Sequence, residues 1–511
     1  MSRTRIVNGK YTKISHGDHN MSAEGYINSN AMIEVRENGT QNGILHGNFE
    51  RLGSDVNEDF EITFSLRKSK EYSTIVPFGI LDFKGKYENA HFVFDYSLTL
   101  SNIDSLKFQI INEDNSILYS IENLPEIVVP SKKMPLLVES IIKGTPIPDP
   151  LKPKKVLDLN SIFNPYNVPP TDYTKIGNYV IFWDGFDNDD IYDSTKFNNT
   201  KLKARIIAKK SDKEKIKEIE FTTEYNEVDW VDVKIDKNNK RIDATLRVNL
   251  TDGGEEGLGY QTVPASSTYP ATEYKPLYDW EKIPKETIVY YGKEPIRKRQ
   301  RTYKELEDLT LKGINQFWSR NSKNIGKGVN IMEDIYEVYV NAKTNDKGLA
   351  APKIVYQTNC EEGRSRNFEA SRILFFYEGY LYKSDWKDNN PKSQFYKNKG
   401  WFYRSENIVE EKNTFINLAP LIEDYKMVAA HEIGHEVLLN YGGNIYSKGH
   451  KGTTTWFNMI SQETNIDAPD KPIEGEIDLM KYYQTYYDIS RTIITEFDLL
   501  KILWLTKIKL R

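Results

Sequence analysis

Residues 431–435 read His-Glu-Ile-Gly-His, and this pattern constrains the fold more than any other part of the chain. On an α-helix, residues four apart lie on one face, so His431 and His435 can present two imidazoles to one point. Glu432 reaches the same side from the next position. The pattern therefore predicts a helix that carries a metal site.

The residues around this pattern predict where the helix begins and ends. Pro420 suits a helix start, and Glu423 complements the positive end of the helix dipole. Gly442 and Gly443 predict the stop, because glycine adopts the left-handed conformation that commonly ends helices. We expect a helix from about Leu421 to Asn440.

Histidine is rare in this chain and is concentrated near the predicted helix. The sequence has seven histidines, and none lies between positions 92 and 430. The last three are His431, His435 and His450. A catalytic zinc site needs three protein ligands and one open position. His450, in a loop flanked by Gly449 and Gly452, is the first candidate for the third ligand. Four downstream carboxylates compete with it: Glu463, Glu474, Glu476 and Asp478.

The five-residue pattern resembles the active-site helix of the zincin superfamily of metallopeptidases, and the resemblance covers little more than that helix. It implies that His431 and His435 bind Zn2+ and that Glu432 is the general base. In such an enzyme zinc activates a water molecule, and the base takes its proton during attack on a peptide bond. The resemblance also implies a donor that stabilises the developing oxyanion.

The resemblance does not extend to the third ligand of any zincin subgroup. Metzincins carry Gly and His at the positions that Leu438 and Tyr441 occupy here. Aspzincins carry an Asp after a Gly-Thr pair, and no Asp follows closely after Gly452-Thr453. The downstream glutamates stand in no clear gluzincin motif. The third ligand therefore stays open. For the oxyanion donor, the candidate is Tyr446, with Tyr441 and Lys451 as alternatives.

The chain before this region reads as β structure. A length of 511 residues favours two to four domains, and plentiful Tyr and Phe in short alternating runs favour strands. Four prolines within Gly144–Pro153 suit a stiff linker, and the glycine-rich run Thr251–Gly259 ends a second β region. We expect a multidomain α+β protein: two β-rich, sandwich-like domains at 1–143 and 154–260, and a zincin-like α+β domain at 275–511.

Individual strands are expected where β-branched and aromatic residues run between turn residues. In the two leading domains these are Phe60–Leu66, His91–Thr99, Ser105–Ile111, Ser116–Ile121, Tyr179–Trp183, Leu202–Lys209, Glu218–Thr223, Trp230–Ile235 and Ala244–Leu250. In the third domain a helix at Tyr303–Trp318 precedes strands at Ile335–Ala342, Lys353–Gln357, Ile373–Tyr382 and Thr414–Leu418. A packed amphipathic helix is expected within Ile493–Leu505.

Composition argues against several classes of function. The net charge of -5 creates no field that favours nucleic acid, and no window reaches the roughly 18 apolar residues of a membrane span. The single cysteine, Cys360, forms no intrachain disulfide and is expected to be a small buried hydrophobe. The acidic run Asp184–Asp193 fits a solvated turn better than a calcium loop. The N-terminus lacks the apolar core of a secretory signal peptide, so we expect cytoplasmic synthesis.

The layout of β-rich leaders before a hydrolase resembles bacterial effectors that contractile injection or type VI secretion systems export. The segment Gly17–Gly25 is similar to the leaders of such proteins. This implies a protein or peptide substrate and contacts with the secretion apparatus. A rival hypothesis is a non-catalytic scaffold with a structural metal site, but such a site is closed by four ligands and has no need of Glu432. A zinc hydrolase of other amides, such as cell-wall peptides, is the third hypothesis.

Overall fold

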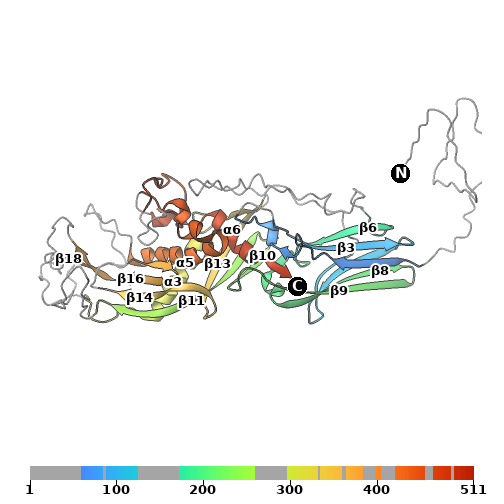
Figure 1. Cartoon of the computed structure of the whole chain (residues 1–511), viewed down its shortest axis with the longest axis horizontal. Coiled ribbons are helices and arrows are strands. Elements are labelled where there is room, and N and C mark those ends of the chain that lie inside the picture. The colour runs from blue at the N-terminus through green and yellow to red at the C-terminus, as the bar shows by residue number, and fades with distance from the viewer. Residues whose placement is uncertain are drawn as a thin grey trace, which may run out of the picture. The chain divides into compact units, whose positions relative to one another are not determined.

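β-Sheets make up most of the structure, and three α-helices lie among the described residues. The computed structural model describes residues 59–83, 88–122, 124, 172–258, 296–331, 334–358, 364–383, 398–403, 420–454, 464–484 and 488–511 (Figure 1). All of them belong to one unit, Asn57–Arg511. The expected combination of a β-rich leading part and later helices is confirmed at this level.

An antiparallel six-stranded sheet joins strands that lie far apart in the sequence. Its order is β2-β21-β9-β8-β4-β5. The bounds in that order are Thr74–Ile75, Ile508–Leu510, Lys213–Tyr225, Thr200–Lys210, Ser105–Ile111 and Ile117–Glu122. The β8–β9 hairpin forms because its residues alternate: in β8 the buried Leu202, Ala204 and Ile206 alternate with Lys201, Lys203 and Arg205. Ion pairs such as Lys201–Glu220, at 2.7 Å, join the exposed faces of the two strands.

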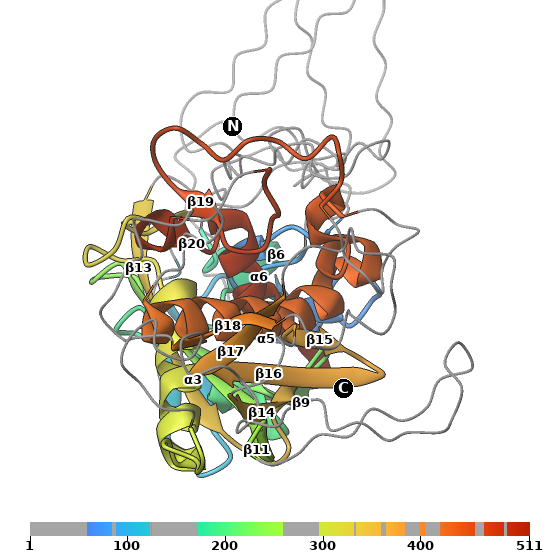
Figure 2. The ribbon, with the colours of Figure 1, turned by 90° about the vertical axis from the view of Figure 1, so that its left-hand side faces the viewer.

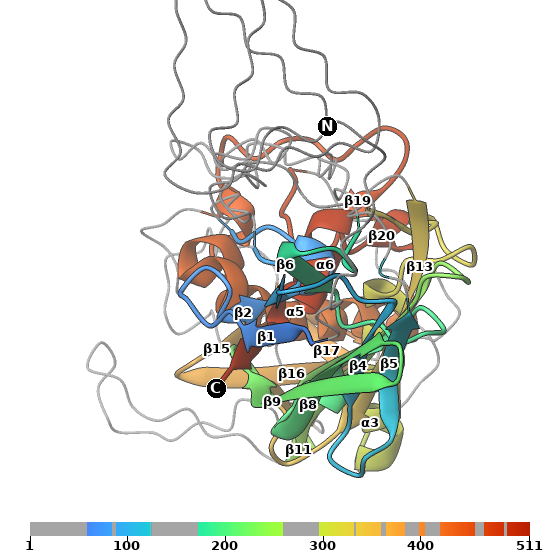
Figure 3. The same ribbon diagram turned by 90° about the vertical axis from the view of Figure 1, so that its right-hand side faces the viewer.

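A three-stranded antiparallel sheet packs against the six-stranded sheet through aromatic rings. It consists of β1 (Glu61–Leu66), β3 (Phe92–Thr99) and β6 (Gly177–Trp183). The ring of Phe94 in β3 lies 5.3 Å from that of Phe108 in β4 and 6.2 Å from that of Phe221 in β9. Figure 3 shows β1 together with β4, β8 and β9. Such ring pairs add stability beyond the area that they bury.

The largest sheet among the described residues has eight strands. The order of its main path is β12-β13-β11-β14-β16-β15, and β10 and β7 join it through β11. The bounds of the path are Val329–Ile331, Asp334–Thr344, Arg241–Glu256, Leu349–Gln357, Ser371–Tyr377 and Arg366–Phe368; β10 is Val231–Asp236 and β7 is Ile191–Asp193. The pairs β11–β13, β11–β14 and β14–β16 are parallel, whereas β15 is antiparallel to β16. The edge strand β15 therefore runs against the direction of its neighbours.

Two helices, α3 (Tyr303–Trp318) and α5 (Leu421–Ser447), pack against each other and against this sheet (Figure 2). A capping box between Thr302 and Glu305 begins α3. Gly313 lets the helices approach closely, because a Cβ at this position would lie 2.4 Å from the carbonyl oxygen of Lys426. Trp318 then donates a hydrogen bond of 3.1 Å to the carbonyl oxygen of Ala430, one residue before His431. The packing thus fixes the position of α5 relative to α3 at the histidine pattern.

Helix α5 is longer than the sequence predicts. It kinks at Gly443, which has a φ of 72°, and then makes a further turn to Ser447. Glycine adopts this left-handed conformation without the clash of a Cβ, so the predicted stop becomes a kink. A 3₁₀ turn, η4 (His450–Gly452), follows directly. The kink therefore turns the chain so that His450 comes back towards the helix.

Most predicted strands and helices are confirmed within a few residues at their ends. The strand predicted at Ile373–Tyr382 divides into β16 and β17 (Gly379–Lys383), and β17 pairs with β18 (Asn398–Tyr403). The strand predicted at Thr414–Leu418 lies outside the described residues. Two short parallel strands, β19 (Ile477–Asp478) and β20 (Thr492–Ile493), were not predicted. None of the helices in the described ranges has the length and apolar character that crossing a membrane requires.

The sheets cross the domain boundaries that the sequence predicts. Strands β3 and β4, from the first predicted domain, pair with β6 and β8 from the second. Strand β11, from the second, pairs with β13 and β14 from the third. Hydrophobic alternation locates a strand but does not identify its partner. The sequence therefore suggested separate units where the strands share sheets. The proline-rich run Gly144–Pro153 lies outside the described residues.

The third helix, α6 (Glu496–Leu505), buries a lysine, and we expect its replacement by methionine to stabilise the fold. The Lys501 ammonium donates to the carbonyl oxygen of Leu81 at 3.2 Å, and burial lowers its pKa to about 7, although Asp498 acts in the opposite direction. An unfolded lysine has a pKa of roughly 10.4. Between these pH values Lys501 is protonated in the unfolded chain and neutral in the folded protein. The free energy of unfolding therefore rises with pH in this range. Lys501→Met should add on the order of 1–4 kcal/mol at pH 7, and less near pH 10.

Thermal unfolding at pH 7 and near pH 10 checks this expectation. Lys509→Met is the matched control, because Lys509 is an exposed lysine of β21, and it should leave both melting temperatures unchanged. A Lys501→Met protein that melts lower than wild type by the same amount at both pH values would contradict the expectation.

Candidate metal centre

Three buried histidines converge at the kinked end of α5. His431 and His435 come from the helix, and His450 comes from η4. Their ligand nitrogens all lie within 4.8 Å of one another. The Nε2 atoms of His431 and His450 are 3.2 Å apart. A tetrahedral zinc ion with bonds of roughly 2.0–2.1 Å keeps its nitrogens ~3.3 Å apart. The cluster therefore has the dimensions of a three-histidine metal site.

The other ring nitrogen of both helical histidines is held by a backbone carbonyl. Nδ1 of His431 lies 2.7 Å from the oxygen of Leu479, and Nδ1 of His435 lies 3.0 Å from the oxygen of Ser447. A carbonyl oxygen only accepts, so each Nδ1 carries the proton and each Nε2 keeps its lone pair. Metal-binding histidines are oriented by partners of this kind. Both rings are thus set in the tautomer that binds a metal through Nε2.

The third histidine is held by a side chain. Nδ1 of His450 lies 2.8 Å from Oγ1 of Thr454, which is also buried. We expect Thr454→Val to weaken zinc binding roughly 10- to 100-fold, because loss of an orienting partner costs about that much in metal affinity. Competition with a coloured chelator measures the change.

Thr454→Ser is the matched control, because serine keeps a hydroxyl group beside Nδ1 of His450. Wild-type affinity is expected for this variant. Equal zinc affinities of Thr454→Val and Thr454→Ser would show that the hydroxyl does not orient His450.

Burial keeps the three rings neutral at physiological pH. It lowers the pKa of His431 to about 4 and the pKa values of His435 and His450 well below the usual 6.5. Neutral imidazole is the form that binds a metal ion. The cluster therefore does not have to lose protons at neutral pH before it binds.

Glu432 lies beside the cluster as a buried carboxyl group, 7% exposed. Burial raises its pKa to about 7, whereas the positive charges of Arg364 and Lys448 lower it. Its backbone oxygen accepts a hydrogen bond of 2.8 Å from the side chain of Asn367 in β15. A carboxyl group with a proton affinity near neutral pH suits a general base.

The carboxylates that compete for the third ligand position have other surroundings. Both oxygens of Glu476 lie 2.7 Å from the guanidinium of Arg320, and Asp478 lies 2.6 Å from the ammonium of Lys451. Glu474 is exposed, and Glu463 lies outside the described residues. Within the described part of the chain, the group that could hold a metal consists of the three histidines alone. His450 therefore completes the pair on α5.

The predicted oxyanion donors are occupied elsewhere. The hydroxyl of Tyr446 donates to Asp498 of α6 at 2.7 Å, and that of Tyr441 lies 3.4 Å from the carbonyl oxygen of Leu81. The buried ammonium of Lys451 pairs with both Asp478 and Asp498. A tyrosine hydroxyl has a single proton. When that proton is hydrogen-bonded to a carboxylate, it is not available to an oxyanion. The structure therefore does not support Tyr446 as the donor.

Sequence reasoning missed Tyr482, which stacks on the cluster. Its ring centroid lies 3.7 Å from that of His450 and 5.8 Å from that of His431. Its hydroxyl accepts a hydrogen bond of 2.9 Å from Arg364. Tyr482 follows β19 in an irregular segment, where no periodic pattern marks it. The one available signal was its closeness in sequence to Asp478.

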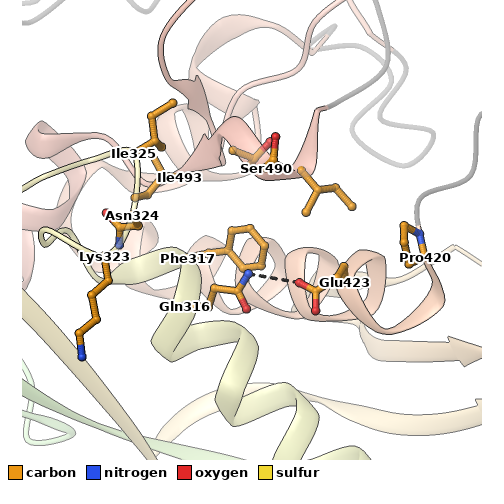
Figure 4. Close-up of a pocket in the computed structure, with 11 residues that line it drawn as sticks. Gln316, Phe317, Lys323, Asn324, Ile325, Pro420, Glu423, Ser490 and Ile493 are labelled. Atoms are coloured by element: carbon orange, nitrogen blue, oxygen red, sulfur yellow. Dashed lines mark hydrogen bonds between the residues drawn. The ribbon is translucent and has the colours of Figure 1, made fainter. Parts of the chain in front are cut away.

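One further feature, a pocket, lies apart from the cluster. A pocket of about 520 Å³ at the start of α5 is lined in part by Phe317, Glu423 and Ile493, and Gln316 donates to Glu423 across it at 3.2 Å (Figure 4). None of the three clustered histidines lines it.

The acidic run Asp184–Asp193 is a turn that leads into β7, and its carboxylates meet nearby donors. Asp184 lies 2.6 Å from the ammonium of Lys237, and Asp187 accepts from the backbone of Asp189 and Ile191 at 3.0 Å each. Backbone bonds of this kind are typical of a turn. Cys360 lies outside the described residues.

The chain matches no known family model and no curated protein, so its function is inferred from the geometry of the site.

Proposed function

We propose that the chain is a zinc-dependent peptidase in which Glu432 is the general base. The observation that carries this proposal is the convergence of three neutral imidazoles beside a buried carboxyl group. Three protein ligands with one open position are typical of catalytic zinc, whereas structural sites close all four positions. A buried glutamate next to the ligands has a role in catalysis and none in a structural site.

Zinc fits the residues of the cluster. Imidazole ligands suit zinc, and the Nδ1 partners of His431 and His435 leave their Nε2 atoms to hold the ion, with Nε2 of His450 3.2 Å from that of His431. When bound, zinc supplies a Lewis acid that acidifies water and polarises a carbonyl group. The catalytic role of the protein is then to hold the substrate and to move protons.

Glu432 takes the proton of the attacking water and passes it to the leaving amine. With Tyr446 committed to Asp498, Tyr482 becomes the candidate for the oxyanion donor. Its hydroxyl accepts from Arg364, so its own proton remains available to donate. A donor that meets charge as it develops stabilises the transition state more than the ground state.

The edge strand β15 favours a peptide substrate. An extended peptide adds to an exposed sheet edge through backbone hydrogen bonds. Strand β15 ends the described eight-stranded sheet, and its Asn367 contacts the backbone of Glu432. Lys448 already holds the backbone oxygen of Asn367, so a peptide at this edge would pair with the groups on either side of it and pass beside the base. The order of α3, the strands and α5 also agrees with our proposal of a zincin-like catalytic domain behind sandwich-like β structure.

The test is metal content and cleavage of the full-length protein. We expect about one zinc ion per chain, cleavage of members of a broad peptide library, loss of cleavage after treatment with a chelator, and its return when zinc is added. Zinc without cleavage of peptides would favour either the scaffold hypothesis or another amide as substrate, and cell-wall peptides would then be the next library. A protein that binds no zinc would end the proposal.

We also propose export by an injection system, and this proposal rests on the sequence alone. The segment Gly17–Gly25, which carries that resemblance, lies outside the described residues. A secretion assay of a tagged chain in a strain with and without a functional apparatus tests it.

A further inference from the structure

A positive side chain stands at the rim of the histidine cluster. The guanidinium of Arg364, which is exposed, donates to the hydroxyl of Tyr482 at 2.9 Å. The ring of Tyr482 in turn stacks on His450 at 3.7 Å. One aromatic ring and one hydrogen bond therefore separate this guanidinium from a metal ligand.

Further positive charges lie in the same region. Lys448 contacts Asn367, whose side chain donates to the backbone oxygen of Glu432, and Arg366 precedes Asn367 in β15. Lys448 is buried and is held by Glu436, at 3.1 Å, and by the carbonyl oxygen of Asn367. The guanidinium of Arg366 donates to two neutral oxygens, those of the Ser371 hydroxyl at 2.7 Å and the Arg364 carbonyl at 3.0 Å. Arg364 is the exposed member of this set.

We propose that the site selects substrates that carry a carboxylate close to the scissile bond, and that Arg364 recognises this carboxylate. The inference rests on the proposed peptidase function and names its substrate class. A guanidinium presents several N–H donors in a plane and so matches the two oxygens of a carboxylate. Like-signed charges around the site repel a basic substrate, so selection comes from both attraction and exclusion.

The carboxylate can come from two sources. One is the side chain of an aspartate or glutamate inside a peptide, and the other is the free C-terminus of a peptide. The first makes the enzyme an endopeptidase with a preference for acidic residues, and the second makes it a carboxypeptidase. Their chemistry at Arg364 is the same, so the experiment has to separate them.

The experiment measures kcat/KM for peptides in matched pairs. After a library has located the cleaved bond, Glu is replaced by Gln at each flanking position, and each peptide is made with a free and with an amidated C-terminus. We expect the wild-type protein to favour one acidic form roughly 10- to 100-fold, the range for a charge-assisted hydrogen bond. Preference for Glu over Gln supports the side chain as source, and preference for the free C-terminus supports the terminal carboxylate.

Arg364→Gln should remove that preference, and Arg364→Glu should reverse it towards lysine at the same position. Arg297→Gln, the same change at an exposed arginine ahead of α3, should keep it. If Arg364 only supports Tyr482, Arg364→Gln will slow the cleavage of all peptides equally, and that result overturns the inference. Cleavage by wild type without any acidic preference also overturns it and leaves the peptidase proposal standing. Absence of zinc and of all cleavage defeats the peptidase proposal itself.

Discussion

Glu432→Gln is expected to keep its zinc and to lose cleavage by roughly two to four orders of magnitude in kcat, the contribution typical of a general base. Glutamine has nearly the shape of glutamate, so the packing of α5 is preserved. The three histidines are unchanged, so the ligand set is complete. Elemental analysis and kinetics on the same preparation separate the two effects.

Glu474→Gln is the matched control for this experiment. Glu474 is an exposed glutamate outside the histidine cluster, so its replacement should change neither metal content nor kcat. Full activity of Glu432→Gln would remove Glu432 from the mechanism, and another base would have to be found. Loss of zinc from Glu432→Gln would instead give this glutamate a part in metal binding.

His450→Ala is expected to weaken zinc binding by more than about 100-fold, because even the loss of an orienting partner costs roughly 10- to 100-fold. Two histidines on α5 would remain, and a catalytic zinc site uses three protein ligands. At a zinc concentration of 100 times the wild-type Kd, wild type gains about 2.7 kcal/mol of stability, and the variant should gain almost none.

Thermal unfolding with and without zinc measures this gain. Comparing the two metal-free proteins first shows whether the variant still folds. His91→Ala removes a histidine that contacts Phe182 in the leading β structure and should keep the zinc-dependent gain. If His450→Ala keeps one tightly bound zinc, the third ligand lies elsewhere, and Glu463 becomes the next residue to change.

The sequence predicted the three histidines of the candidate site because local patterns were sufficient there. Residues four apart on a helix share a face whatever the rest of the chain does, so the sequence alone predicts that His431 and His435 lie together. The scarcity of histidine pointed to His450. At Gly443 the sequence predicts a stop and the structure has a kink, because the sequence shows that glycine permits a left-handed φ but not which direction the chain takes next.

The partners around the histidines were not predictable in the same way. Two of the three orienting groups are backbone carbonyls, those of Leu479 and Ser447, and every residue has a carbonyl. Tyr482 reaches the cluster through tertiary packing alone. Tyr446 lies close to the motif in sequence, yet its hydroxyl is bonded to Asp498 of α6.

The arrangement of the strands shows the same limit at a larger scale. Alternating patterns located β3, β4, β6 and β8 nearly residue by residue, but the pairing of β3 with β6 and of β4 with β8 joins ranges that composition had separated. Register depends on which buried faces meet, and that information is spread over the whole chain.

The position of β21 has a consequence for synthesis on the ribosome. This strand inserts between β2 and β9, so Ile508–Leu510 completes a sheet whose other members were translated long before. Until these residues emerge from the exit tunnel, β9 presents an unpaired edge to other chains. The helix with the histidines, Leu421–Ser447, leaves the tunnel earlier. A nascent chain therefore holds all three histidines while that sheet is still open, and stalling between these two points would leave an aggregation-prone intermediate that already carries the residues of the metal site.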